Sequence, residues 1–384
     1  LYTINAIDKA IEIGMGKRTN TILQSAFFKL ANVMPIDEAV DFMKAAAKKS
    51  YGKKGDAVVE MNYKAIDAGV DAVHKVEVPA SWSNPAADPA PKKLTGRPET
   101  VKMVEDLMNP IALMDGDSLP VSAFMGNPDG QFEQGASAYE KRGIAVDIPV
   151  WQSENCIQCN RCAYVCPHAV IRPVALTEEE LAKAPEGTKA IDMIGMPGMK
   201  FTMTVSAYDC TGCGSCVNVC PGKKGEKALV MANMEENAAE QDIFDFGREI
   251  EVKPEVVAKF KPETVKGSQF KQPLLEFSGA CAGCGETPYA KLITQLFGDR
   301  MYIANATGCS SIWGNSSPST PYTMNSKGQG PAWSNSLFED NAEFGYGMLL
   351  AQKAIRKRLK EEVETVAASE QASAEVKAAC QECL

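Results

Sequence analysis

Long apolar runs are absent from this sequence of 384 residues, since no stretch of about 18 or more apolar residues occurs. We therefore predict no membrane-spanning helix and no membrane partner for this chain. The N-terminus lacks a charged segment followed by an apolar core, so we expect no secretory signal there. Clustered lysines are also absent, and the net charge of −9 argues against nucleic acid as a partner.

Histidine is scarce as well, with two residues, whereas cysteine is abundant, with thirteen. The single histidine near the N-terminus, His74, is more often structural than catalytic when it stands alone. Many thiols without a secretory signal predict a reducing, anaerobic cytoplasm as the setting. A composition of 45% hydrophobic and 23% charged residues is that of a folded globular protein, and the length allows about two to four domains.

Eight of the cysteines form two copies of one pattern. The copies are Cys156-x2-Cys159-x2-Cys162-x3-Cys166-Pro167 and Cys210-x2-Cys213-x2-Cys216-x3-Cys220-Pro221. This is the spacing by which a ferredoxin-type domain holds two [4Fe–4S] cubanes, with the fourth cysteine of each copy binding the other cluster. The predicted ligands are Cys156, Cys159, Cys162 and Cys220 for cluster one, and Cys210, Cys213, Cys216 and Cys166 for cluster two. The chain is therefore expected to move electrons.

Neither a zinc site nor a set of disulfides accounts well for these cysteines. Zinc sites use four ligands in paired CxxC units, usually with histidine, and the doubled pattern leaves no economical zinc arrangement. Disulfides require an oxidising compartment and do not call for repeated spacing. In the second copy, Gly212 and Gly214 allow backbone N–H groups to approach the sulfurs closely.

Apolar periodicity predicts helices in the first 82 residues, one of them beginning with Pro35 as its first residue and stopping at residues 50–52, and another near residues 62–72. We interpret this part as the closing portion of an α/β domain. Proline-rich residues 81–91 indicate an extended linker, and a short helix is expected over residues 98–108. Thr177 and Glu180 form a capping box for a small inserted helix. A strand is expected at residues 301–304 and a charged helix at residues 354–363.

A third group of cysteines comprises Cys281 and Cys284, in a glycine-rich turn, and Cys309, which follows the expected strand. By spacing alone these three are a zinc fragment, a redox pair, buried thiols or part of a cluster. The polar tract of residues 310–323 comes where α/β proteins build ligand sites, although an ordinary loop has the same composition. Cys380 and Cys383 form a second CxxC, which we interpret as free thiols rather than a metal site.

Taken together, these residues resemble the pyruvate:ferredoxin (flavodoxin) oxidoreductase family over essentially the whole chain. The segments that carry the resemblance are Gln24-Ser25-Ala26-Phe27-Phe28-Lys29-Leu30, Tyr139-Glu140-Lys141-Arg142-Gly143, Gly308-Cys309-Ser310-Ser311-Ile312-Trp313-Gly314 and Asn335-Ser336-Leu337-Phe338-Glu339-Asp340-Asn341-Ala342-Glu343. The second segment matches the small module that is named for its EKR sequence in this family.

The resemblance implies a multidomain protein of mixed α/β and α+β class. Residues 1–82 match the C-terminal part of the family's gamma-type domain, which is α/β, and residues 83–150 match a linker and the EKR module. Residues 151–262 match a bacterial-type ferredoxin domain with two clusters. Residues 263–384 match the N-terminal half of an α/β domain that binds thiamine diphosphate.

The resemblance also implies ligands that spacing does not. Cys281, Cys284 and Cys309 are three ligands of a third [4Fe–4S] cluster in this interpretation, with the fourth ligand absent from the sequence. Glu286 and Cys309 are the implied thiamine diphosphate contacts. We find no Gly-Asp-Gly with a downstream asparagine to hold Mg²⁺ and the diphosphate. The chain also begins at Leu1 without methionine, so it reads as an internal piece that is inactive by itself.

The function implied is oxidative decarboxylation of pyruvate to acetyl-CoA and CO₂ by the complete enzyme, with electrons passing through the clusters to ferredoxin or flavodoxin. Coenzyme A is then a further substrate, and a cytoplasmic homodimer is expected. Two alternatives remain at this stage. The chain is a non-catalytic carrier module with two clusters, or it belongs to a related oxidoreductase that acts on another 2-oxoacid.

Overall fold

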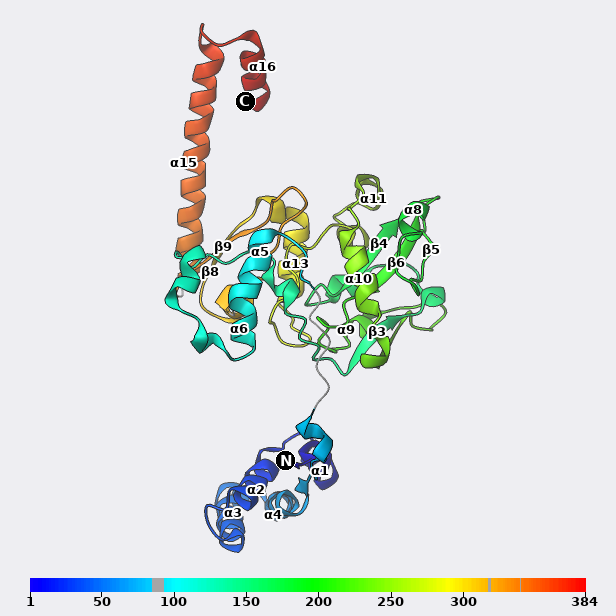
Figure 1. The fold of residues 1–384 in the computed structure, drawn as a ribbon, viewed down its shortest axis with the longest axis vertical. Helices are drawn as coiled ribbons and strands as arrows, with labels where there is room; N and C mark the ends of the chain where they lie inside the picture. Colours follow the sequence, from blue (N-terminus) through cyan, green and yellow to red (C-terminus); the bar gives the residue numbers. More distant parts are fainter. Residues whose placement is uncertain (85–92, 317–318, 339) are drawn as a thin grey trace. The chain divides into compact units, whose positions relative to one another are not determined.

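The computed structural model of the chain describes residues 1–84, 93–316, 319–338 and 340–384. It divides into two compact units, Leu1–Lys93 and Leu94–Leu384 (Figure 1). The second unit contains the predicted ranges 151–262 and 263–384, together with most of the predicted EKR module. Most of the predicted linker lies outside the described residues, because residues 85–92 are not described. The same holds for residues 317–318 of the polar tract 310–323, and for Glu339 of the segment that carries the family resemblance.

The first unit is mainly helical. Its elements are β1 (Tyr2–Thr3), α1 (Ala6–Ile13), α2 (Asn20–Ala31), α3 (Ile36–Tyr51), η1 (Gly52–Lys54), α4 (Asp56–Asp71), β2 (His74–Lys75) and η2 (Ala80–Ser83). The helices confirm the periodicity, but Pro35 lies at the N-cap of α3 rather than within its first turn. The sheet consists only of the short antiparallel pair β1–β2, and His74 lies in it, paired with Thr3.

Close contact between α2 and α4 holds this unit together. Ser25 on α2 donates a hydrogen bond from Oγ to the carbonyl oxygen of Ile66 on α4, at 2.5 Å. Gly69 on α4 lies against the backbone of α2, where an added Cβ would come within 2.2 Å of the Ile22 carbonyl oxygen. The two backbones therefore approach each other at a distance that only glycine permits.

The second unit begins with a helical segment and three short turns. Its first elements are α5 (Pro98–Met103), η3 (Val104–Met108), α6 (Asn109–Ala112), η4 (Gly116–Ser118), η5 (Val121–Gly126) and η6 (Ala136–Tyr139). The helix predicted over residues 98–108 is confirmed, although its second half forms a π turn and α6 extends it. Met103, Val104, Leu107 and Met108 bury one face of this segment around Ala136.

The middle of the second unit contains both cysteine runs. Its elements are β3 (Asp147–Trp151), η7 (Ser153–Asn155), α7 (Arg161–Val165), β4 (Ile171–Leu176), α8 (Glu178–Leu181), β5 (Ile191–Asp192), β6 (Lys200–Val205), α9 (Ser215–Val219), β7 (Leu229–Asn233), η8 (Glu235–Asn237), α10 (Glu240–Glu249), α11 (Pro254–Phe260) and α12 (Val265–Ser268). The predicted capping box of α8 is present, with Thr177 and Glu180 each bonded to the other's backbone.

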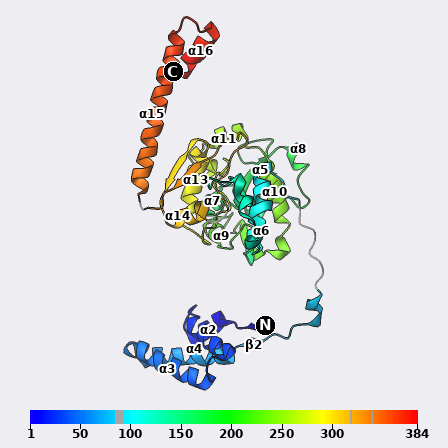
Figure 2. The same cartoon turned by 60° about the vertical axis from the view of Figure 1, so that its left-hand side comes forward.

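Two antiparallel pairings relate the two cysteine runs. The strand before the first run, β3, pairs with the strand after the second run, β7. The strand after the first run, β4, pairs with the strand before the second run, β6. The helices of the runs, α7 and α9, pack against each other (Figure 2). Each run therefore ends beside the strand that begins the other.

The last part of the second unit comprises α13 (Thr287–Phe297), η9 (Gly298–Arg300), β8 (Tyr302–Asn305), α14 (Cys309–Ser311), η10 (Ile312–Ser316), β9 (Ala332–Asn335), α15 (Asn341–Ala368) and α16 (Ala374–Cys383). β8 and β9 form a parallel pair, which confirms the strand expected near residue 301. α15 is much longer than the predicted charged helix, because its i,i+4 ion pairs, such as Lys357–Glu361, support a helix with no buried described residue.

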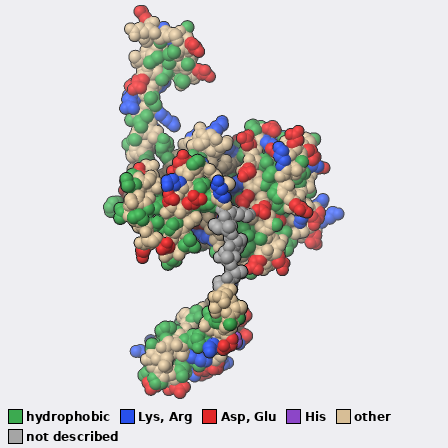
Figure 3. Space-filling view, in the orientation of Figure 1, with side chains coloured by type: hydrophobic (Ala, Val, Ile, Leu, Met, Phe, Trp, Pro, Cys, Tyr) green, Lys and Arg blue, Asp and Glu red, His purple; other side chains and the backbone are tan. Residues whose placement is uncertain are grey.

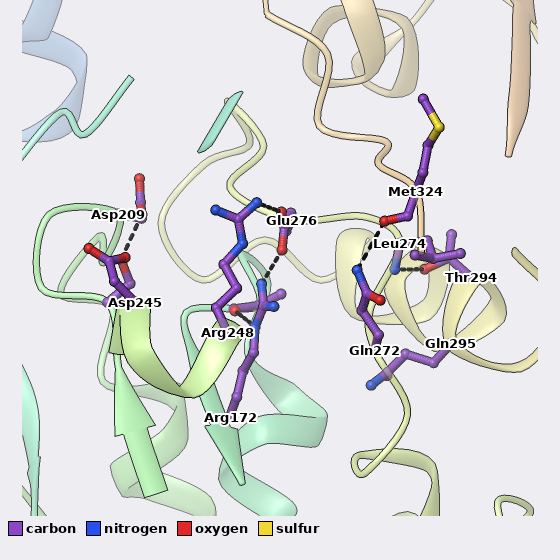
Figure 4. A network of polar contacts seen from close by, with 12 residues as sticks. Arg172, Asp209, Asp245, Arg248, Gln272, Leu274, Glu276, Thr294, Gln295 and Met324 are labelled. Carbon is purple, nitrogen blue, oxygen red and sulfur yellow. Dashed lines mark hydrogen bonds and ion pairs between the residues drawn. The ribbon is translucent and has the colours of Figure 1, made fainter. Parts of the chain in front are cut away.

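A buried ion-pair network fastens the segment before the third cysteine group to the ferredoxin-like part. Glu276 is 1% exposed, and its two carboxylate oxygens accept from Arg172 on β4 and from Arg248 on α10, the latter at 2.8 Å (Figure 4). Burial opposes ionisation of Glu276, but Arg248 and Arg172 outweigh it and hold the pKa of the carboxyl below its usual range.

None of the described helices is both long and apolar enough to cross a membrane. On the face drawn in Figure 3, acidic and basic side chains are interspersed over the second unit.

Replacing Gly69 with alanine is expected to destabilise the first unit by about 1–3 kcal/mol, because the added methyl group overpacks against α2. Gly52→Ala is the matched control, since Gly52 has open space around it and a helical φ of −54°. That variant should be neutral or stabilised by about 0.4–1 kcal/mol. Amide hydrogen exchange in α2 and α4 of the full chain measures both, and equal protection in the two variants would contradict the close contact.

Replacing Glu276 with glutamine is expected to cost about 3–5 kcal/mol of unfolding free energy, because it removes a buried carboxylate that Arg172, 13% exposed, and Arg248, 37% exposed, share as their counterion. Urea unfolding under nitrogen measures the loss. The control is Glu361→Gln on α15, which removes an exposed ion pair and should change stability by less than about 1 kcal/mol. Equal losses in both variants would show that the Glu276 network does not stabilise the unit.

Candidate iron–sulfur site

The two cysteine runs follow the same backbone path. The residue two places after the first cysteine has a left-handed φ in both runs, +56° at Gln158 and +66° at Gly212. The residue four places after it repeats this, with +58° at Asn160 and +72° at Gly214. These reversals turn successive cysteines of a run toward one side, which a loop that wraps a cluster requires.

Gln158 and Asn160 hold this path in the first run although neither is glycine. Gln158 is 1% exposed, donates to the Asp192 carbonyl oxygen at 2.8 Å and accepts from the backbone N–H of Ile194 at 2.8 Å. Asn160 donates to the Lys266 carbonyl oxygen at 2.9 Å. Sequence reasoning missed both residues, although alignment of the two runs places them opposite Gly212 and Gly214.

The first predicted ligand set lines one cavity. All four thiols of the set, Cys156, Cys159, Cys162 and Cys220, line it, together with apolar side chains that include Trp151 and Leu229. The side chain of Trp151 lies beside the Cys156 thiol, and its N–H opposes the rise that burial causes in the pKa of Cys156. A bound sulfur cluster fits this cavity, because four thiols and an N–H donor line it inside an apolar shell.

The second predicted ligand set is brought together in the same way. Cys166, Cys210 and Cys213 lie close enough to Cys216 that their negative charges would raise its pKa, after the larger effect of burial. Burial, followed by Cys166 and Cys213, raises the pKa of Cys210 to about 12. Iron must therefore displace protons that these thiols hold tightly.

The strand pairing relates the fourth cysteine of each run to the other run. Cys166 follows α7 and leads into β4, which pairs with the strand that leads to Cys210. Cys220 follows α9 and leads into β7, which pairs with the strand that leads to Cys156. The fourth cysteine of each run consequently lies nearer the other run, as the spacing predicts.

Backbone N–H groups point at three of the sulfurs. Gln158 donates to Sγ of Cys156 at 3.4 Å, and Gly212 donates to Sγ of Cys210 at 3.4 Å. Ala228 donates to Sγ of Cys220 at 3.3 Å. Hydrogen bonds of this kind stabilise negative charge on ligand sulfur and are one means by which a protein sets a cluster potential.

Single-ion sites are absent from the described residues, in which no group of three or more His, Cys, Asp or Glu side chains is arranged to hold one metal ion. A zinc ion needs four ligands within about 2.0–2.3 Å of a single centre. The thiols instead surround a cavity, which suits a larger inorganic group with several metal atoms.

The cysteines of the third group are more exposed to solvent than those of the first two sets. Cys281 and Cys309 are exposed and Cys284 is half-buried. The turn between Cys281 and Cys284 lies beside the second set, since a Cβ built on Gly283 would be 3.6 Å from the Cβ of Cys213. The backbone N–H of Glu286 donates to Sγ of Cys284 at 3.4 Å, which repeats the pattern of the other two runs.

Glu286 connects this turn to the segment that contains Cys309. Its Oε2 accepts a hydrogen bond from Nε1 of Trp313 at 3.3 Å, and Trp313 is four residues beyond Cys309. Trp313 packs with Leu275 and Tyr322 in a small buried cluster. Burial, with a further contribution from the Glu286 carboxylate, raises the pKa of Tyr322. The predicted thiamine contact Glu286 is therefore held at the edge of an apolar cluster.

Cys380 and Cys383 lie on α16, where Cys380 is half-buried and Cys383 is exposed. They belong to no group of metal-binding side chains among the described residues. The structure does not place them with Cys281, Cys284 and Cys309 as a substitute fourth ligand.

His168 connects the first cysteine run to the third group, and sequence reasoning missed it. It is 2% exposed, its backbone oxygen accepts from Phe277 at 2.9 Å, and its Nδ1 lies 3.1 Å from the Ser278 carbonyl oxygen. A carbonyl oxygen only accepts, so Nδ1 carries the proton. Both contacts fix the segment that leads to Cys281.

The Glu140-Lys141-Arg142 segment contacts the start of the second run. Nζ of Lys141 lies 2.6 Å from the carboxylate of Asp209, the residue before Cys210. The backbone N–H of Gly143 donates to the Tyr208 carbonyl oxygen at 2.8 Å. Nearby, Gly135 donates to the Tyr322 carbonyl oxygen at 2.7 Å. The module therefore packs against both the second run and the segment after the third cysteine group.

Three family models match separate parts of the chain. Residues 1–72 match a pyruvate ferredoxin/flavodoxin oxidoreductase model, residues 155–224 match a 4Fe-4S dicluster domain, and residues 87–145 match EKR, a domain of unknown function. The dicluster domain supports two [4Fe–4S] clusters in this chain.

Among curated proteins, the chain is 54% identical to pyruvate:ferredoxin oxidoreductase of Moorella thermoacetica, covering 99% of this chain and 32% of that protein. It is 52% identical to pyruvate-flavodoxin oxidoreductase of Enterobacter agglomerans, over 94% of the chain and 30% of the relative. It is also 46% identical to a pyruvate dehydrogenase [NADP(+)] of Cryptosporidium parvum, over 94% of the chain and 20% of that relative. The chain thus spans about a third of the first two relatives. It belongs to the pyruvate:ferredoxin (flavodoxin) oxidoreductase family.

Proposed function

We propose that this chain is the electron-transfer and partial cofactor-binding segment of a pyruvate:ferredoxin (flavodoxin) oxidoreductase. The complete enzyme would convert pyruvate and coenzyme A to acetyl-CoA and CO₂ and deliver electrons to ferredoxin or flavodoxin. The observation that carries this proposal is a pair of four-thiol sets, with matching backbone paths, in a chain 54% identical to such an enzyme over 99% of its length. Function as an isolated carrier, without catalysis, is the second candidate.

The ligands of the clusters are proposed as Cys156, Cys159, Cys162 and Cys220 for the first, and Cys166, Cys210, Cys213 and Cys216 for the second. The cavity lined by the first set and the mutual proximity of the second support this assignment. When bound, the clusters supply one-electron carriers. The protein supplies N–H donors to the sulfurs, an apolar shell and fixed charges, which together set the potentials.

A direction of electron flow follows from the positions of the thiols. The turn of Cys281 and Cys284 lies against Cys213 of the second set, so electrons would enter there. The second set adjoins the first through α7 and α9. Ile157, at the cavity of the first set, is 43% exposed, and we propose this surface as the contact for the acceptor protein.

Further cofactors are proposed for the complete enzyme. A third [4Fe–4S] cluster would use Cys281, Cys284 and Cys309 with a fourth ligand from elsewhere in the enzyme. Glu286 and Cys309 would contact thiamine diphosphate, whose Mg²⁺ needs ligands that we did not recognise in this sequence. We also propose a homodimer in the cytoplasm, where ligand thiols stay reduced.

Replacing Cys159 with alanine is expected to remove one low-potential cluster and about four iron atoms per chain, because the alanine methyl group cannot bind iron. Iron analysis, electron paramagnetic resonance and viologen-dye reduction under nitrogen measure the loss. Cys380→Ala is the matched control and should leave all three unchanged. Unchanged iron content and dye reduction in the Cys159 variant would overturn the ligand assignment.

A separate experiment on the complete enzyme tests whether this segment takes part in catalysis or only carries electrons. There, Glu286→Gln should raise the thiamine diphosphate concentration needed for half-maximal pyruvate-dependent CO₂ release, while the iron content stays at the wild-type value. An unchanged thiamine diphosphate requirement would remove Glu286 from the cofactor site and favour the carrier function for this segment.

A further inference from the structure

Lys291 is a buried lysine between the two ligand sets. It lies on α13, is 1% exposed, and belongs to the segment after the third cysteine group rather than to either cysteine run. Its Nζ donates to the carbonyl oxygen of Ala163 and, at 3.2 Å, to that of Tyr164. These carbonyls form the last turn of α7, between Cys162 of the first set and Cys166 of the second.

No carboxylate balances this charge. Lys291 forms no salt bridge with any residue that the structure describes, and no carboxylate is among the charges that act on it, although a buried ammonium group without a counterion is costly by several kcal/mol. Burial lowers its pKa to about 8, and the thiolates of Cys166 and Cys162 act in the opposite direction. The negative groups that act on the pKa of Lys291 are therefore two proposed cluster ligands, one from each set.

A second lysine occupies the equivalent position in the other run. Nζ of Lys227 donates to the carbonyl oxygens of Val217, at 2.5 Å, and Asn218, at 3.5 Å. Val217 and Asn218 follow Cys216 just as Ala163 and Tyr164 follow Cys162. Each short cluster helix thus ends on a lysine ammonium group, which is the favourable place for a cation on a helix.

The two lysines differ in burial. Lys227 is exposed, so water and salt screen its charge, whereas Lys291 is enclosed by protein. A charge in a low-dielectric interior acts several times more strongly on its neighbours than the same charge at a surface. Two cations, one from α13 and one from the segment after the second run, therefore lie at matching positions beside the ligand sets, and Lys291 is the one shielded from solvent.

We propose that Lys291 is the buried countercharge of the two clusters and favours their reduced states, whereas Lys227 only caps α9. A cluster becomes more negative by one charge when it accepts an electron, so a fixed cation stabilises the reduced form and raises the potential. Tyr164, whose carbonyl oxygen accepts from Lys291, is two residues from both Cys162 and Cys166, so the second cluster should respond as well as the first. This inference rests on the proposed ligand sets.

The test compares midpoint potentials of the full chain, with its clusters in place, by redox titration followed by electron paramagnetic resonance. Lys291→Gln keeps N–H donors without the charge, and Lys291→Met removes both. In either variant, the ratio of reduced to oxidised second cluster at a fixed solution potential should fall at least tenfold. That change equals about 59 mV for a one-electron couple.

Lys291→Arg should restore the ratio to within about threefold of the original, because arginine keeps the charge. Lys227→Met is the matched control and should change the ratio less than about twofold, since its charge is screened. Unchanged potentials in Lys291→Gln with full iron content would overturn the proposal. A shift in Lys227→Met equal to that in Lys291→Met would overturn it as well.

Loss of the clusters from a Lys291 variant also tests the proposal. If both uncharged variants lose iron while Lys291→Arg retains it, the requirement for a buried charge is supported. If Lys291→Arg loses iron too, Lys291 serves packing alone and the proposal fails. Absence of any iron–sulfur signal from the unaltered chain would instead overturn the proposed function, so the two failures are distinguishable.

Discussion

Burial of ligand thiols is the constraint on which the second unit depends. Cys162, Cys166, Cys210 and Cys216 are part of the same hydrophobic core as Ile148, Trp151 and Phe201. Thiols in such surroundings resist ionisation, yet iron binds the thiolate. Three features offset the cost of ionising these buried thiols. Backbone N–H groups are directed at the sulfurs by left-handed turns, and a lysine lies at the end of each cluster helix.

The same unit joins three parts that are distant in sequence. Glu276 ties the approach to the third cysteine group to β4 and α10 through two arginines. His168 fixes the adjacent residues Phe277 and Ser278, and Lys141 fixes Asp209 beside Cys210. For the EKR module, whose role is not defined by its family model, these contacts indicate that it braces the second cysteine run against the segment near Tyr322.

Local patterns in the sequence predicted the elements that depend on neighbouring residues. The helix near residues 98–108, the capping box at Thr177 and the strand at residues 302–305 follow from spacing and turn chemistry, which act within a few residues. The extent of α15 was underestimated, because the prediction followed its charged stretch, whereas the helix begins at Asn341 in a segment of mostly uncharged residues. The role of Gln158 was also missed, because its left-handed conformation depends on hydrogen bonds to residues more than thirty positions away.

The sequence by itself determined the spacing from which the two proposed ligand sets follow, since three cysteines spaced by two residues converge whenever a short loop wraps them. It also determined the family resemblance, which lies in contiguous motifs. Only the tertiary structure decided what surrounds those thiols: the lysine from α13 between the sets, the arginines on Glu276 and the turn of Gly283 against Cys213. These contacts join residues separated by 28 to 128 positions, so they depend on how distant segments pack rather than on any local pattern.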